Sequence, residues 1–194
     1  MSTSQATGLP YIEEGEADAR TATLFATVKR EMQVPFVPNW MKAIAASSAA
    51  LEGYWGLFSN FTARTTIPAS LQAMICYAVA SSNNCRYCAA GNELSCRIYG
   101  IDDDTLNALV KDLDNVSPQR LQAIIKFALQ VAHDPQSITR ADYDALRAHG
   151  VADEEIIEIV IMAGIAQLND IMADSLKIEV DPGVAEALGI HHTG

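Results

Sequence analysis

Basic residues are scarce in this 194-residue sequence, which has 13 Lys and Arg against 24 Asp and Glu. The net charge of −11 repels phosphate backbones and anionic lipid, so we expect no nucleic-acid partner and no membrane-surface partner. Long apolar runs are lacking as well. The longest run, Ile156 to Leu168, is interrupted by Glu158 and Gln167 and is too short to span a bilayer.

Several functional signatures are also missing. The polar first sixteen residues have neither the basic start nor the apolar run of a secretory signal. The chain has no phosphate-cradling glycine loop, no Ser/His/Asp signature and no nucleic-acid motif. Four cysteines without a secretory signal indicate a reducing compartment, so we expect a cytoplasmic protein. In that context a Cys-x-x-Cys motif serves catalysis or metal binding more often than a structural disulfide.

The composition and the hydrophobic spacing predict an all-α protein. Hydrophobic residues make up 49% of the chain, which is long enough for one well-buried domain and short for two. The apolar spacing is helical almost throughout, without a convincing alternating strand, and it predicts about eight or nine helices. We divide the single domain into a helical lead-in (1–65), a half that bears Cys-x-x-Cys (66–116) and a second helical half (117–194).

A weak internal repeat links the two halves. Gly100-Ile-Asp-Asp-Asp-Thr-Leu is followed fifty residues later by Gly150-Val-Ala-Asp-Glu-Glu-Ile. In each copy a helix is expected to end at the glycine, and acidic residues begin the next helix, where the helix dipole favours them. Because the second copy has no Cys-x-x-Cys, we expect the chemistry to lie in the first copy.

The most informative segment is Asn83-Asn84-Cys85-Arg86-Tyr87-Cys88, at a polar break after an apolar helix. Two thiols at this spacing can close a small disulfide ring, and a helix N-terminus favours the thiolate form. On one helix, Cys85, Cys88, Asn92 and Cys96 lie within an arc of roughly 80°, at about 100° per residue. One helix face therefore carries three sulfur atoms and an amide.

This segment, continued by Ala89 and Ala90, resembles the AhpD-like alkylhydroperoxidase and carboxymuconolactone decarboxylase family, in its peroxidase-related branch. The run 146–157 and Asn169 support the resemblance, which covers most of the chain from about residue 37. It implies an all-α fold, a homo-oligomer such as a trimer or a multiple of one, and thiol-dependent reduction of hydroperoxides. It further implies a dithiol reductant or adaptor protein as electron donor, and no metal or organic cofactor.

The chain departs from the family pattern where protons would move. Active members place a Glu twelve residues before the first cysteine, where this chain has Ala73, and a His four residues after the second, where it has Asn92. Some carry a His between the cysteines, where this chain has Tyr87. An amide donates a hydrogen bond to a thiolate but cannot take its proton, so the expected proton relay is missing.

Four residues make up the predicted catalytic site: Cys85, Cys88, Tyr87 and Asn92. The resemblance implies that a deeper Cys88 is attacked by peroxide to give a sulfenic acid, which Cys85 resolves as a disulfide. Helix geometry alone favours Cys85 as the more acidic thiol, so the order of attack stays open. The alternative interpretation is structural: the cysteines and Tyr87 pack in a core, and Asn92 ties two helices together.

The other two cysteines carry weaker signals. We expect Cys76 to lie in the core, and Cys96 to be either a packed residue or a spare resolving thiol. A zinc site on all four cysteines would use Cys85-x-x-Cys88 as one hook, but Cys76 and Cys96 lack the spacing of a second hook. We therefore predict no metal site.

Three functional hypotheses follow. The first is a thiol oxidoreductase that reduces hydroperoxides or exchanges disulfides, weak or specialised because the proton relay is missing. The second is a non-catalytic helical assembly or binding protein that retains the fold. The third, a lactone decarboxylase, draws only on fold analogy, since such enzymes need a base in the pocket and no Cys-x-x-Cys.

Overall fold

The fold is helical, as the spacing predicted. The computed structural model describes residues 2–3 and 7–190, and this part contains ten α-helices rather than eight or nine. The helices are α1 Ala19–Met32, α2 Asn39–Ile44, α3 Ser48–Arg64, α4 Ala69–Ser82, α5 Arg86–Ile98, α6 Asp103–Lys111, α7 Gln119–His133, α8 Arg140–Ala148, α9 Asp153–Ser175 and α10 Pro182–Leu188. Three short 3₁₀ turns cover Glu14–Glu16, Leu113–Asn115 and Pro135–Ser137.

One feature escaped the periodicity analysis. The strands β1 (Ser2–Thr3) and β2 (Pro10–Tyr11) form an antiparallel pair of two residues each. A pair this short is below the length at which alternation is visible in a sequence. It leaves the all-α class unchanged.

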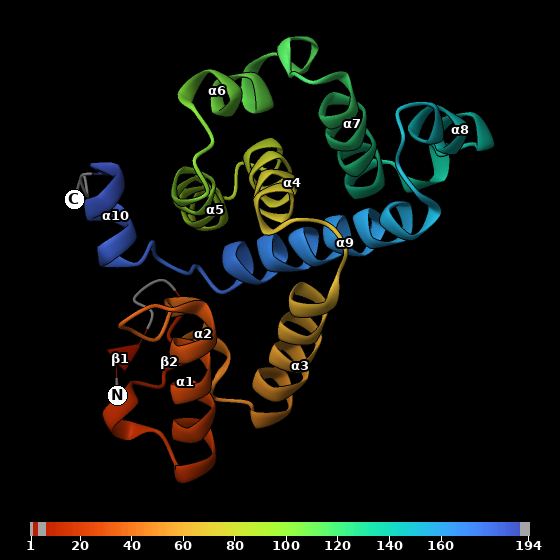
Figure 1. The fold of residues 1–194 in the computed structure, drawn as a ribbon. Helices are drawn as coiled ribbons and strands as arrows, with labels where there is room; N and C mark the ends of the chain where they lie inside the picture. Colours follow the sequence, from red (N-terminus) through yellow and green to blue (C-terminus); the bar gives the residue numbers. More distant parts are fainter. Residues whose placement is uncertain (1, 4–6, 191–194) are drawn as a thin grey trace.

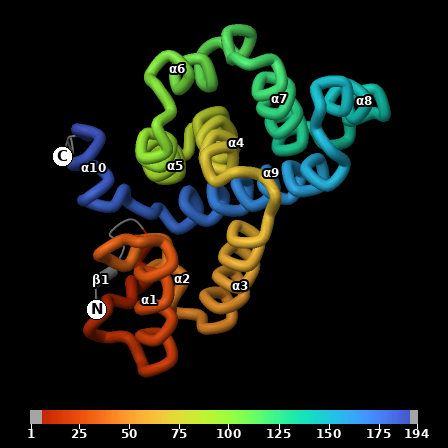
Figure 2. The backbone as a smooth tube through the Cα atoms, in the orientation of Figure 1, coloured from red at the N-terminus to blue at the C-terminus, as the bar shows by residue number. Residues whose placement is uncertain are grey.

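Helix α9 is the centre of the architecture. Figures 1 and 2 show it crossing the molecule, with α1 to α3 on one side and α4 to α8 on the other. The larger core cluster joins α4, α7 and α9 through buried residues such as Ile75, Ile124 and Ile159. A second cluster, with Phe25, Met41 and other residues of α1 to α3, receives the C-terminal end of α9. Helix α9 therefore contacts both cores.

The outer face of α9 carries an apolar stripe. Its exposed residues Ile157, Ile161, Gly164, Leu168 and Ile171 are spaced by four, three, four and three residues. Ile157 is 64% exposed and Ile171 is 59% exposed. This spacing is that of a helix seam that packs against another helix. Helix α9 is also long and apolar enough to cross a membrane by length and composition, although its inner face is packed in the two cores.

The two copies of the repeat have matching backbones. Gly100 and Gly150 adopt φ values of 80° and 76°, a left-handed conformation that ends a helix with little strain only at glycine. In the first copy Arg97 pairs with Asp103 at 2.6 Å, and in the second Arg147 pairs with Asp153 at 2.7 Å. The same turn therefore joins α5 to α6 and α8 to α9.

Candidate functional site

The cysteine pair lies at the tight turn between α4 and α5. Asn84 adopts a left-handed conformation with φ 59°, which an Asn side chain tolerates better than most. The chain reverses there, and the Cys85 N–H donates to the Ala80 carbonyl at 2.9 Å. Cys85 occupies the N-cap of α5, so Cys88 lies in its first turn. Both thiols are at the positive end of the helix dipole, as predicted.

Both thiols are buried beneath other segments. Cys85 is 0% exposed and Cys88 is 7% exposed, so Cys85 rather than Cys88 is the deeper residue. The expectation of a deeper Cys88 is therefore wrong, because the N-cap position turns Cys85 toward the body of the molecule. The pair belongs to a small apolar cluster with Ala80, Ala173 and Ile178, against which Trp40, Ala43, Tyr87, Ala89 and Leu176 pack.

A carboxylate that the sequence analysis missed lies beside the two sulfur atoms. Asp170 of α9 is 3% exposed, and one of its oxygens and the Sγ atoms of Cys85 and Cys88 all lie within 4.8 Å of one another. Its Oδ2 accepts a hydrogen bond from Asn83 Nδ2 at 2.7 Å. Its Oδ1 is buried without a hydrogen-bond partner among the described residues. Asp170 therefore offers an open acceptor to the thiol pair.

Further amides hold Asp170 in place. Asn83, the last residue before the left-handed turn, also donates to the side-chain oxygen of Gln167 on α9. Gln167 in turn donates from Nε2 to the Ala132 carbonyl of α7 at 3.2 Å. This chain of amides fixes the carboxylate on the side facing the thiols.

Burial and neighbouring groups shift the pKa of the Asp170 carboxyl and the pKa of the Cys88 thiol. Burial raises the pKa of the Asp170 carboxyl, an effect that the Asn83 amide and the two neighbouring thiols partly offset. The pKa of the Cys88 thiol is raised above its usual range by its hydrogen bond to Cys85, by burial and by the negative charge of Asp170. The Cys88 thiol therefore holds its proton more tightly than a free cysteine does.

An aromatic wall borders the site. The Tyr54 hydroxyl donates to the Asn169 side-chain oxygen, and burial raises the pKa of this phenol, which also feels the charges of Cys76 and Cys88. Trp40 stacks edge-on against Tyr54 with ring centroids 5.0 Å apart, and Phe58 lies 6.0 Å from both rings. Trp40 packs on the thiol cluster, so this aromatic group borders the thiols on the side where the Tyr54 hydroxyl lies.

Tyr87 binds the segment that covers the thiols. Its hydroxyl donates to Asp181 Oδ2 at 2.8 Å and accepts from the backbone N–H of Trp40 at 3.3 Å. The other oxygen of Asp181, Oδ1, accepts from the Asn39 N–H at 2.8 Å. Because Asp181 directly precedes α10, Tyr87 links α5, α2 and the α10 segment across the site. Its hydroxyl is engaged away from the sulfur atoms, and its catalytic role stays a prediction.

The amide of Asn92 is engaged as well. Its Nδ2 donates to the Cys88 carbonyl at 2.8 Å, one turn back along the same helix. The geometry therefore places this amide on the backbone of the cysteine and not on its sulfur. Ala73 is a buried core residue of α4, so neither of the two positions where the family carries its relay supplies a proton acceptor here.

The other two cysteines lie in the larger core. Burial raises the pKa of Cys76 and of Cys96 to about 12 each. Cys76 matches its predicted core position, and Cys96 is fully buried on the inner face of α5. Among the described residues, the ligand atoms that gather within 4.8 Å are those of Cys85, Cys88 and Asp170, so a four-cysteine set is not assembled.

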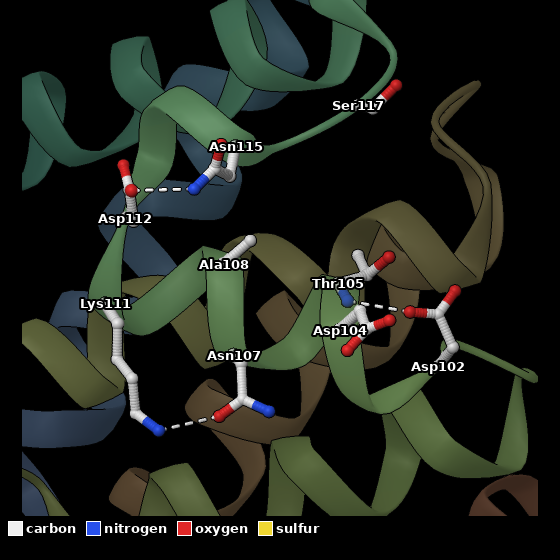
Figure 3. Close-up of a pocket in the computed structure, with 9 residues that line it drawn as sticks. All are labelled: Asp102, Asp104, Thr105, Asn107, Ala108, Lys111, Asp112, Asn115 and Ser117. Carbon is white, nitrogen blue, oxygen red and sulfur yellow. Dashed lines mark hydrogen bonds between the residues drawn. The ribbon is translucent and has the colours of Figure 1, made fainter.

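A surface groove lies elsewhere on the molecule. It has a volume of about 550 Å³ and is lined by α6 and the turn that follows it (Figure 3). Several of its polar side chains bind one another. Lys111 donates to Asn107 at 2.8 Å, and Asp112 accepts from Asn115 at 2.7 Å. With no thiol in its lining and these polar groups paired, this groove offers less chemistry than the buried cysteines.

Comparison with known proteins identifies the fold. No family model matches the sequence, and no curated protein matches it. An uncharacterized peroxidase-related protein from Ralstonia eutropha JMP134, described as an alkylhydroperoxidase AhpD core, is 21% identical, with a TM-score of 0.82 over 90% of this chain and 92% of that one. A peroxidase-related protein from Silicibacter sp. TM1040 is 20% identical, with a TM-score of 0.78 over 95% and 96%.

A third similar structure is that of an enzyme. The debrominase Bmp8 is 17% identical, with a TM-score of 0.79 over 96% of this chain and 99% of that one. A cysteine-to-alanine variant of Bmp8 has been crystallised with 2,3,4-tribromopyrrole. At these identities the likenesses establish an AhpD-like fold, which confirms the fold that the sequence predicted.

The site combines elements that are distant in sequence. The thiols come from the first copy of the repeat and the nearby carboxylate comes from α9, the helix that begins in the second copy. The expectation that the chemistry lies in the first copy stays a prediction. One signal was present in the sequence. Asp170 is the one charged residue of α9 between Glu158 and Asp174, and a buried charge in such a helix is costly unless it has a function or a partner.

Proposed function

We propose that this protein is a cytoplasmic dithiol oxidoreductase of the alkylhydroperoxidase type, which reduces hydroperoxides or exchanges disulfides through Cys85 and Cys88. The proximity of the Asp170 carboxylate to both sulfur atoms carries the proposal. It supplies the proton acceptor that Ala73 and Asn92 cannot provide. General acid–base assistance of this kind is typically worth about 10²–10⁴-fold in rate.

In the proposed reaction Asp170 takes the proton of Cys88, the more accessible thiol. The thiolate attacks the outer oxygen of the hydroperoxide, so that an S–O bond forms and the O–O bond breaks. The leaving alkoxide takes the proton back from Asp170 and departs as an alcohol. Cys85 then attacks the Cys88 sulfenic acid, and the disulfide forms as water leaves. A dithiol reductant or adaptor protein restores both thiols by disulfide exchange.

Substrate access requires the cover over the thiols to move. Trp40, Ala43, Leu176 and Ile178 pack on the cluster that contains the pair, and Tyr87 holds Asp181 beside it. We propose that opening of this α2 and α10 cover precedes the reaction. The aromatic wall favours a hydroperoxide with an apolar group over hydrogen peroxide itself.

Mass spectrometry of alkylated protein tests the proposal. The reduced chain is treated with stoichiometric alkyl hydroperoxide, quenched with an alkylating agent and digested. We expect a disulfide between Cys85 and Cys88 that forms faster than in an unstructured Cys-x-x-Cys peptide. In the matched control, Cys96→Ala, the disulfide should form at the wild-type rate. Absence of this disulfide would favour the alternative of a non-catalytic helical assembly.

A second candidate activity is removal of a halogen from an aromatic ring. The likeness to the debrominase and the rings of Trp40, Tyr54 and Phe58 beside the site favour it. The Cys88 thiolate would attack the halogen, and the ring carbon would take a proton as its bond to the halogen breaks. Cys85 would then displace halide from sulfur to form the same disulfide. Halide release from a brominated pyrrole distinguishes this activity from peroxide reduction.

The proposal includes a homo-oligomer. The stripe on α9 has nearly the same spacing in both directions from Gly164, where an added Cβ would meet nothing within 4 Å. Two antiparallel copies would therefore pair Ile161 with Leu168 and Ile157 with Ile171 around a two-fold axis. Ile161→Asp should reduce the mass seen in sedimentation by at least half, because it removes this two-fold contact. The control is Arg140→Asp, which changes an exposed residue of α8 away from the stripe and should leave the sedimentation mass unchanged.

A further inference from the structure

The buried acidic cluster has the make-up of a metal site. We propose that the reduced protein binds one thiophilic divalent cation, Zn²⁺, through the Sγ atoms of Cys85 and Cys88 and a carboxylate oxygen of Asp170. The inference does not depend on the proposed redox function, because it needs only the reduced thiols and the carboxylate. Bound in this way, the cation acts as an inhibitor of the thiols.

The spacing of the three ligand atoms fits a tetrahedral ion. All three lie within 4.8 Å of one another and belong to buried residues. Zinc binds thiolate sulfur at about 2.3 Å and carboxylate oxygen at about 2.0–2.2 Å, so tetrahedral ligands lie about 3.5–3.8 Å apart. A small contraction of the side chains therefore brings all three within bonding distance of one ion. The fourth position is left for water or a small anion.

The Asp170 carboxylate has a buried oxygen that is free to bind the cation. Asp170 Oδ1 is buried and has no hydrogen-bond partner in the part of the chain that the structure describes, while Oδ2 is fixed by Asn83 at 2.7 Å. A buried, unpaired carboxylate oxygen costs free energy unless a cation or a donor reaches it. The amides of Asn83 and Gln167 would act as the outer shell that orients a metal ligand.

The charges select the class of metal. The ligand set of two thiolates and one carboxylate carries three negative charges. A dication replaces the protons that otherwise hold this cluster together, and it does so best when the metal favours sulfur. Thiolate ligands select Zn²⁺ over Mg²⁺ and Ca²⁺, which prefer oxygen.

Metal binding and disulfide formation exclude each other. Each sulfur atom uses the same lone pair for the cation and for attack on a substrate, and the disulfide leaves neither thiolate free. Zinc should therefore slow peroxide-driven disulfide formation in proportion to site occupancy. A chelator should restore the original rate.

Metal analysis of the full-length reduced protein tests the site. Under anaerobic conditions we expect one Zn²⁺ per chain after incubation with zinc chloride and removal of excess. With Co²⁺ as the probe, we expect the visible bands of a tetrahedral ion and the near-ultraviolet band of thiolate-to-cobalt charge transfer. Cys85→Ala and Cys88→Ala should each reduce the charge-transfer band by half or more. Each should also abolish the binding of one ion per chain.

Two substitutions near the site separate ligands from neighbours. Asp170→Asn should weaken zinc binding by about 100-fold or more. Asn83→Ala should weaken it by the roughly 10–100-fold typical of an outer-shell partner. The matched control is Cys96→Ala, which removes a buried thiol of the same helix and should bind zinc as the wild type does. Circular dichroism establishes that each variant is folded.

Three results would overturn the inference. They are a wild-type stoichiometry far below one, a cobalt spectrum unchanged by Asp170→Asn, and equal loss of binding in Cys96→Ala. A protein that binds zinc but forms no disulfide with peroxide would refute the proposed function and leave the metal site intact. A protein that forms the disulfide but binds no zinc would do the reverse.

Discussion

Cys85 and Cys88 are about as buried as Cys76 and Cys96, but the two pairs have different surroundings. The first pair lies at the N-terminal end of α5 with the Asp170 carboxylate beside it. The second pair faces the larger core, where burial raises both thiol pKa values to about 12. Burial alone therefore does not distinguish the two pairs. They differ in their polar neighbour and in their position relative to the helix end.

Removing one thiol from each pair should give the largest contrast. Cys88→Ser should reduce hydroperoxide turnover to the uncatalysed background, because an alcohol is a far weaker nucleophile than a thiolate. Cys96→Ala should keep turnover within about twofold, since no step uses its sulfur. Peroxide consumption with a dithiol reductant measures both. An equal loss of turnover in the two variants would contradict the proposal that only the first pair takes part in the reaction.

Removing the neighbour tests why the pairs differ. Asp170→Asn keeps the side-chain shape and an acceptor for Asn83 but cannot take a proton. The rate of disulfide formation between Cys85 and Cys88 should fall by about 10²–10⁴-fold. Rapid quench with an alkylating agent follows the rate, and raising the pH should partly rescue the variant. A wild-type rate in this variant would show that the helix end alone activates the thiols.

Loosening the cover should expose one pair and leave the other buried. Tyr87→Phe removes the hydrogen bond to Asp181 and leaves a buried carboxylate oxygen without that donor. The loss should lower the free energy of unfolding by about 1–3 kcal/mol. Under native conditions alkylation of Cys85 and Cys88 should speed up, while that of Cys76 and Cys96 stays slow. Unchanged alkylation with reduced turnover would instead support a catalytic role for Tyr87.

The smallest expected effect is on stability as a function of pH. Burial raises the pKa of Asp170 in the folded state above its unfolded value, so the folded state binds the proton more strongly. The stability that it contributes is complete below the unfolded pKa and is lost as the pH rises through the folded pKa. Asp170→Asn should therefore gain stability over the wild type as the pH rises above the unfolded pKa of about 3.9. Urea denaturation over a series of pH values measures the difference, and an opposite sign would contradict the raised pKa.

Local features of the fold could be predicted from sequence because they depend on near neighbours. Helical spacing identified the all-α class, and the glycine turns at Gly100 and Gly150 have the expected left-handed backbone. Thr139 and Asp142, spaced as in a capping box, form the capping interaction at the start of α8. Each of these depends on residues within a few positions of one another.

The site itself depends on contacts between distant segments. Asp170 reaches the thiols only because α9 packs against α4 and α5, and that packing is not a local property of the sequence. The cover by Trp40 and the link from Tyr87 to Asp181 have the same origin. Spacing on one helix correctly grouped Cys85 with Cys88. It could not show that Asn92 bonds the backbone instead of a sulfur.

Helix α9 carries the carboxylate on its inner face and the apolar stripe on its outer face. One continuous helix thus carries both the carboxylate proposed to act on the thiols and the surface proposed to contact a second chain. Hydrogen exchange along this helix would then report two events at once: a change of thiol state near Asp170 and the binding of a second copy of α9 near Gly164.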